Sequence, residues 1–183
     1  MRRKLCAKRG MTLMEVLCAI AVMGLLTAAI AFALPATAAT YQSLTSGAEA
    51  AVLCSTLSEA VAQELRFAAN IKSPSGSFAA DGGPFVYDSQ RFGPGVELTL
   101  CDMDGVVCVA AQSAADAAVV YPLISTGAYT SNLEAHGENA TRFVYLPEKG
   151  LFYVALTVYN AHTQGYVWNE FYVRPLNPPA KGE

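Results

Sequence analysis

A long uncharged segment near the N-terminus limits the fold of this chain more than any other feature. No charged side chain occurs from residue 16 to residue 34. As an α-helix, residues 11–34 would be about 36 Å long, at about 1.5 Å per residue, and the hydrocarbon core of a bilayer is about 30 Å thick. An ordinary signal peptide has a shorter apolar part, of about 7–15 residues. The sequence therefore predicts a transmembrane helix over residues 11–34.

The residues before this helix are basic, whereas the rest of the chain is acidic. Residues 1–10 contain no acid and five basic residues, which are Arg2, Arg3, Lys4, Lys8 and Arg9. Lys and Arg mark the cytoplasmic side of a membrane helix, so we expect residues 1–10 to be a cytoplasmic leader. Without the leader, seven Lys and Arg remain against fifteen Asp and Glu, a net charge of −8. A chain this acidic, with no basic patch, is a poor binder of nucleic acid.

Glu15 stands out because it places a charge near the start of an apolar helix. A carboxylate at mid-membrane costs about 2.5–3.5 kcal/mol, and near a helix end it reaches the headgroups at lower cost. The surrounding sequence is Lys8-Arg9-Gly10-Met11-Thr12-Leu13-Met14-Glu15-Val16-Leu17. It resembles the class III signal of type IV pilins and pseudopilins, in which a basic leader ends in Gly and a Glu lies just inside the membrane helix. Met11 stands where that family usually has Phe.

The resemblance implies how the chain is processed and assembled. A prepilin peptidase would cleave between Gly10 and Met11 on the cytoplasmic face and N-methylate Met11. In a filament, the Glu15 carboxylate would neutralise the α-ammonium of residue 11 in a neighbouring subunit, since an unpaired charge among apolar helices is costly. The implied partners are the prepilin peptidase, other pilin or pseudopilin subunits, an assembly platform protein with its ATPase, and membrane lipid. The implied location is the bacterial inner membrane with the N-terminus in the cytoplasm, followed by an extracytoplasmic filament or the cell surface.

Two other interpretations of this region remain open. Glu15 can be an acid that reaches the headgroups in a plain signal anchor. Ala36-Thr37-Ala38 also matches the A-x-A pattern of ordinary signal peptidase, which would cut after Ala38 and release a secreted or surface-anchored binding domain. The N-terminal residue of the mature protein distinguishes these interpretations.

After Pro35 the pattern becomes that of an amphipathic helix. Apolar residues recur at i+3 and i+4 on one side, while polar residues fall on another. The apolar positions are Leu53, Leu57, Val61, Leu65 and Ala68, and the polar positions are Glu59, Gln63, Arg66 and Asn70. We therefore expect an amphipathic helix over residues 35–72 that continues the membrane helix, with a bend near Pro35.

Residues 73–183 are predicted to form a β-rich globular domain. Short apolar or β-branched runs separated by turn residues favour antiparallel strands. The predicted strands are 85–88, 96–100, 106–110, 118–123, 141–146, 151–159 and 166–174. A long N-terminal helix, half membrane-spanning and half amphipathic, packed on an antiparallel β-sheet is an α+β fold. This fold agrees with the resemblance to pilins.

A predicted hairpin near residue 104 brings two cysteines together. Asp104-Gly105 suits a two-residue type I′ turn, which would place Cys101 opposite Cys108 with Cβ atoms about 4.5–5.5 Å apart. A disulfide needs a slightly shorter separation and an oxidising compartment, so the alternative is two small buried residues. The sequence Asp-Met-Asp-Gly at 102–105 is also a fragment of a calcium loop, but it lacks the third oxygen ligand before the Gly and the distal Glu of the full motif.

No familiar catalytic or metal-binding motif occurs in the sequence. The G-x-S-x-G, H-E-x-x-H, P-loop, G-x-G-x-x-G and C-x-x-C patterns are all absent. We therefore expect no enzyme activity, no metal and no cofactor. The sequence favours a structural subunit of a type IV pilus, a type II secretion pseudopilus or a DNA-uptake apparatus. Met11 and the lack of a major-pilin signature in the domain favour a minor subunit.

The C-terminal part of the chain is rich in aromatic residues. They are interpreted as core and cross-strand packing, with a sticky contact surface as the alternative. These residues are Tyr145, Tyr153, Tyr159, Tyr166, Trp168 and Tyr172.

Overall fold

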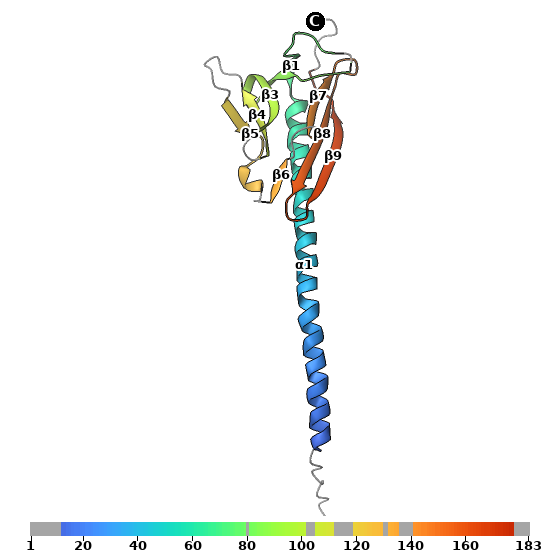
Figure 1. The fold of residues 1–183 in the computed structure, drawn as a ribbon. Helices are drawn as coiled ribbons and strands as arrows, with labels where there is room; N and C mark the ends of the chain where they lie inside the picture. The colour runs from blue at the N-terminus through green and yellow to red at the C-terminus, as the bar shows by residue number, and fades with distance from the viewer. Residues whose placement is uncertain are drawn as a thin grey trace, which may run out of the picture. The chain divides into compact units, whose positions relative to one another are not determined.

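The protein has an α+β fold in which one long N-terminal helix is followed by antiparallel β-structure (Figure 1). A computed structural model describes residues 12–79, 81–101, 105–111, 119–129, 132–135 and 141–177. The chain divides into two compact units, Met1–Leu44 and Thr45–Glu183. The helix α1, Leu13–Arg66, contributes residues to both units.

In the first unit, the described residues form the apolar part of α1. This helix is long and apolar enough to cross a membrane. Pro35 lies inside the helix, where it lacks the N–H that an α-helix uses at this position. The Thr37 hydroxyl donates to the carbonyl oxygens of Ala33 (3.1 Å) and Leu34 (2.9 Å). Neither of these is the carbonyl of residue 31, which an N–H at residue 35 would bond in an α-helix. The expected bend at Pro35 stays a prediction.

The helix ends at Arg66, so the prediction that it extends to residue 72 is wrong for its last residues. The N–H groups of Phe67 and Ala68 donate to the carbonyls of Glu64 and Leu65, both at 3.3 Å. These i→i−3 bonds tighten the final turn. The next residues form the strand β1, Ala69–Lys72, because they pair with β2, Val86–Ser89. Strand pairing in the folded domain therefore overrides the helical pattern of the sequence.

The β-structure forms two sheets rather than the single meandering sheet expected. The first has the order β1-β2-β3-β4-β5, with β3 at Gly93–Cys101, β4 at Val106–Ala111 and β5 at Val119–Pro122. All the described pairs are antiparallel. A short 3-10 helix, Thr126–Ala128, follows β5.

The second sheet is organised around β8, Leu151–Asn160. The strand β9, Gly165–Val173, pairs with β8 along its full length. On the opposite edge, β7, Arg142–Leu146, pairs with the first half of β8, and β6, Leu133–Ala135, pairs with the second half. Gly150 has a φ of +62° in the tight turn between β7 and β8, a conformation that glycine adopts without steric cost.

The core lies between α1 and both sheets. In Figure 1, β3, β4 and β5 lie on one side of the upper part of α1, and β7, β8 and β9 lie on the other. The predicted apolar stripe is confirmed, since all its members are buried: Leu53, Leu57, Val61, Leu65 and Ala68. They pack in one cluster with Val96 and Val107 of the first sheet and Phe152 and Val154 of the second.

Candidate functional site

The first turn of α1 contains a helix cap that the sequence analysis missed. Thr12 precedes the first helical residue, and its hydroxyl accepts a 3.3 Å hydrogen bond from the Glu15 N–H. The same N–H lies 3.0 Å from the Thr12 carbonyl oxygen. Thr12-Leu13-Met14-Glu15 has the T-x-x-E spacing of a capping box. That spacing was readable in the sequence and identifies where the helix begins.

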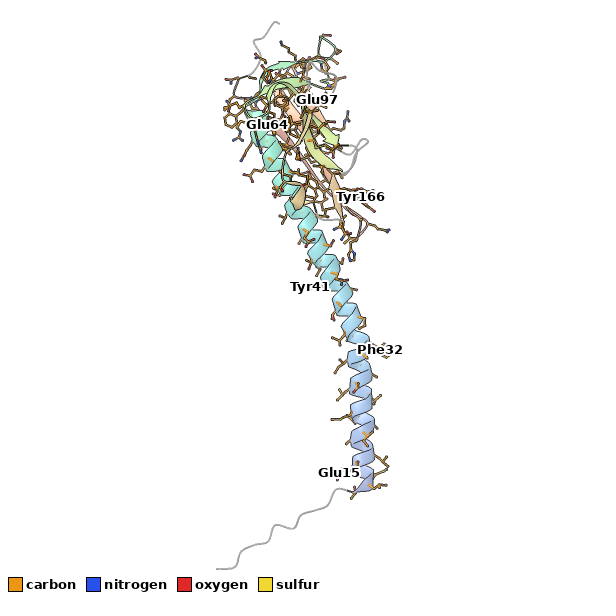
Figure 2. All side chains as sticks on the ribbon, turned by 90° about the vertical axis from the view of Figure 1, so that its left-hand side faces the viewer. Glu15, Phe32, Tyr41, Glu64, Glu97 and Tyr166 are labelled. Carbon is orange, nitrogen blue, oxygen red and sulfur yellow. A yellow bond between two sulfur atoms is a disulfide. The ribbon has the colours of Figure 1, made fainter. Side chains whose placement is uncertain are left out.

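Glu15 itself is exposed in this first turn (Figure 2). A carboxylate there lies near the positive end of the helix dipole, which is a favourable position. Glu15 therefore has a stabilising role within its own helix, whatever it contacts in an assembly. Gly10 and Met11, the predicted cleavage junction, lie outside the described residues.

The apolar segment that follows has no cover from the rest of the described chain. Every described side chain from residue 12 to residue 44 is exposed, Cys18 included. Large apolar side chains are strongly exposed, with Leu13 and Phe32 both at 82%. Apolar area of this extent is stable only out of water, so lipid or other protein chains must surround this helix. By length and composition, the described part of α1 is able to cross a membrane.

The predicted cysteine hairpin has a different register from the one expected. Cys101 lies opposite Val106, and Cys108 lies opposite Thr99. The two-residue turn at Asp104-Gly105 is therefore wrong, because the connection between the paired strands spans residues 102–105. Residues 102–104 themselves lie outside the described residues, and the calcium-loop interpretation lies there with them.

Cys101 and Cys108 are nevertheless joined by a disulfide, with their Cα atoms 6.0 Å apart. They lie diagonally across the strand pair on one face, since both share that face with Val106. This is the face opposite the main core, which takes Val107 and Val109 from β4. The disulfide therefore fastens the end of the β3–β4 hairpin.

Gly105 allows the β3–β4 hairpin to lie in close contact with β6 of the second sheet. Its φ is +57°, and its carbonyl accepts a 2.6 Å hydrogen bond from the Ala135 N–H in β6. A Cβ atom at this position would lie 2.6 Å from the Cβ of Glu134. Only glycine fits so close a contact between two strands.

The other predicted residues do not assemble into a reactive centre in the described structure. Cys54 is a free cysteine buried in the core, and burial raises the pKa of its thiol. A buried thiol with a raised pKa is a poor nucleophile. Among the residues that the structure describes, no three His, Cys, Asp or Glu side chains are grouped so that they could hold a metal ion.

Comparison with known proteins identifies the N-terminal segment. The family model described as the prokaryotic N-terminal methylation motif matches residues 5–31. No curated protein and no solved structure matches the chain. The motif implies processing by a prepilin peptidase and assembly with other pilin subunits, and together with the apolar helix it fits a protein anchored in the inner membrane. Residues 5–31 are therefore a type IV pilin-like prepilin segment, joined to an α+β, pilin-like arrangement of one long helix and antiparallel β-structure.

Proposed function

We propose that this chain is a structural, non-enzymatic subunit, and a minor one, of a type IV pilus-like or pseudopilus filament. It is made as a prepilin, cleaved after Gly10 and N-methylated at Met11. The observation that carries this proposal is the methylation motif over residues 5–31, which from Leu13 onward lies on a helix with every described side chain exposed up to residue 44.

The exposed apolar helix suits a subunit that is first held in the membrane and then transferred into a filament. In the membrane, lipid covers the apolar side chains of α1. In a filament, the same side chains pack against the helices of neighbouring subunits, so the transfer exposes little apolar area to water. An assembly platform protein and its ATPase would drive that transfer. The basic leader keeps the N-terminus in the cytoplasm until it is cleaved.

Glu15 gives the assembly its register in this proposal. Cleavage creates an α-ammonium at Met11, and a neighbouring Glu15 carboxylate neutralises it within a sheath of apolar helices. A buried charge without a partner is strongly unfavourable, so only a neighbour docked in the correct axial position satisfies both groups.

Cleavage by ordinary signal peptidase has less support. Ala36-Thr37-Ala38 lies inside α1, well away from either end of the helix. Proteolysis favours exposed, irregular segments over regular structure.

Mass spectrometry of protein extracted from membranes tests the proposal. The expected product comprises residues 11–183 with one methyl group on Met11. In cells that lack the prepilin peptidase, and in a Gly10→Val variant, the full-length precursor should remain in the membrane. A soluble product beginning at Ala39 would show that the chain is a secreted domain instead. The amount of the protein relative to the main subunit in sheared filaments tests the minor role.

A further inference from the structure

The outer face of the second sheet carries aromatic side chains that the core does not use. Alternate residues of β8 and β9 point away from α1, and on β9 these include Tyr166, Trp168 and Tyr172. Their exposed fractions are 56%, 69% and 61%, and Figure 2 shows Tyr166 on the side of the sheet away from the helix. We name this surface the outer aromatic face: Tyr153, Tyr159, Tyr166, Trp168 and Tyr172.

Cross-strand contacts hold the rings in place. Tyr153 lies opposite Tyr172 with ring centroids 5.4 Å apart, and Tyr159 lies opposite Tyr166 at 5.0 Å. Both pairs are tilted, a favourable geometry for neighbouring aromatic rings. Rings fixed before binding lose little conformational entropy when a ligand stacks on them.

A charged row crosses the middle of this aromatic face. Arg142 of β7, Ala155 of β8 and Glu170 of β9 lie directly beside one another across the sheet. Ala155 is the smallest of the three, so the guanidinium and the carboxylate stand on either side of a short side chain. Burial raises the pKa of Tyr153, and a hydrogen bond from its hydroxyl to Glu170 adds to the effect. The row therefore places a positively charged hydrogen-bond donor, the Arg142 guanidinium, and a negatively charged acceptor, the Glu170 carboxylate, between aromatic side chains on either side.

A groove continues this surface at the edge of β7. It has a volume of about 600 Å³ and is lined by residues 81–84 together with Arg142, Val144, Leu146 and Tyr153. The loop that forms its wall is held by two backbone hydrogen bonds between Gly83 and Tyr145, of 3.2 Å and 3.0 Å. Pockets that hold small ligands are typically about 300–1,000 Å³, with apolar walls and a few polar groups.

We propose that the outer aromatic face and this groove bind a neutral oligosaccharide. A sugar ring presents C–H groups on its faces, which stack on aromatic rings, and hydroxyls at its rim, which bond to carboxylate and guanidinium groups. The two kinds of group lie side by side here, in rows two residues apart along each strand. The proposal is independent of the filament role and adds a binding activity to it.

The charge distribution favours this ligand over other classes. The net charge of −8 after removal of the leader disfavours nucleic acid and other anionic polymers.

Trp168 provides a direct test because it is the only tryptophan in the chain. The full-length protein, in a zwitterionic detergent without sugar groups, is titrated with cellohexaose, chitohexaose, xylohexaose and maltohexaose. We expect at least one of them to change the Trp168 fluorescence saturably at millimolar concentrations or below. The same sugar should protect Trp168 from quenching by acrylamide.

Matched variants locate the site. Tyr172→Thr and Glu170→Gln should each weaken binding of that sugar at least about tenfold, the effect expected for central contact residues. Tyr121→Thr, on β5 of the other sheet and 43% exposed in the native protein, should leave the affinity unchanged. No response to any of the four sugars overturns the proposal. The proposal is also overturned if Trp168 becomes protected from acrylamide without any sugar, either at higher protein concentration or on addition of lipid vesicles. The face would then be a self-association surface or a membrane surface.

Discussion

The side-chain amide of Asn160 in β8 donates hydrogen bonds of 2.8 Å to both the carbonyl oxygen and the hydroxyl of Ser46 in α1. The two residues are 114 positions apart in the sequence. The Asn160 amide oxygen also accepts from the N–H groups of His162 (3.0 Å) and Thr163 (3.2 Å). Asn160 is only 1% exposed. One buried side chain therefore fastens the helix to the sheet and shapes the turn between β8 and β9.

Replacing Asn160 should destabilise the domain strongly. Asn160→Ala would leave several buried donors and acceptors unpaired, for a loss of about 2–4 kcal/mol in the free energy of unfolding. Asn169→Ala is the matched control, because exposed Asn169 makes one 2.9 Å bond to Ser58, worth about 0.5–1.5 kcal/mol. Urea unfolding followed by Trp168 fluorescence measures both. If both variants lose the same free energy of unfolding, the buried Asn160–Ser46 contact contributes no more to stability than the exposed Asn169–Ser58 bond.

We expect Cys101 and Cys108 to be bonded in protein isolated with its thiols blocked. Both lie in one tryptic fragment, since no Lys or Arg occurs between residues 91 and 142. The protease Asp-N cleaves before Asp102 and Asp104 and so separates Cys101 from Cys108. The peptide that ends at Cys101 and the peptide that contains Cys108 should therefore be found linked without reductant and separate after reduction. Replacing both cysteines by Ser should lower stability by about 2–3 kcal/mol, the value for a closed loop of this length.

Cys54 serves as the internal control for that experiment. Because it is 2% exposed and its thiol pKa is raised by burial, it should resist maleimide in the folded protein and react after unfolding. Cys101 or Cys108 labelled in oxidised, folded protein would contradict the disulfide.

Asp88 should make stability depend on pH in the acid range. Its carboxylate accepts from the Asn70 side chain at 2.6 Å and from the Gly95 N–H at 2.9 Å, and the Asn70 bond is the main cause of its lowered pKa. A lowered pKa in the folded state stabilises the protein above the unfolded pKa of about 3.9, and this stabilisation is lost as pH falls through the folded pKa.

The Asp88→Asn variant tests this dependence. The wild type should exceed it in stability by no more than about 1 kcal/mol at pH 7, because the site is close to solvent, and the difference should shrink below about pH 4. Glu148→Gln, in the exposed turn after β7, is the surface control. A difference that stays constant from pH 7 to pH 3 would contradict a role for the carboxylate charge.

Local patterns in the sequence predicted much of this fold. The apolar stripe from Leu53 to Ala68 is buried as expected, and all seven predicted strands exist with their ends shifted by a few residues at most. These features depend on side-chain periodicity, which is a local property. The strands β1 and β6 were missed because each has only three or four residues and forms through distant pairing.

The details of the candidate sites depended more on distant contacts. The β3–β4 register differs from the prediction because a type I′ turn was inferred from two residues, whereas Gly105 is held by β6. The Ser46–Asn160 contact has no local pattern at all. The Thr12–Glu15 cap, in contrast, was present as a readable T-x-x-E spacing.

Glu15 has two separable roles, one within its helix and one between subunits. The first is at the helix start, where the Glu15 backbone N–H bonds to the Thr12 hydroxyl and the carboxylate lies near the positive end of the helix dipole. The second is the proposed charge pair with the α-ammonium of a neighbour's Met11. Glu15→Gln keeps a residue that suits a capping box and removes the charge. Thr12→Val removes the hydroxyl cap and keeps the charge.

If the charge pair controls assembly, Glu15→Gln should insert into the membrane, be cleaved after Gly10 and enter filaments poorly. Breaking one side of a buried ion pair costs about 3–5 kcal/mol, and about 1.4 kcal/mol corresponds to a factor of ten. Incorporation should therefore fall by roughly two orders of magnitude or more. Thr12→Val should lose only about 1 kcal/mol of helix stability and assemble nearly as the wild type does. The measurement is the ratio of processed protein in sheared filaments to processed protein left in the membrane. Normal incorporation of Glu15→Gln, or an equal defect in Thr12→Val, would leave Glu15 as a residue of the first helical turn without a role between subunits.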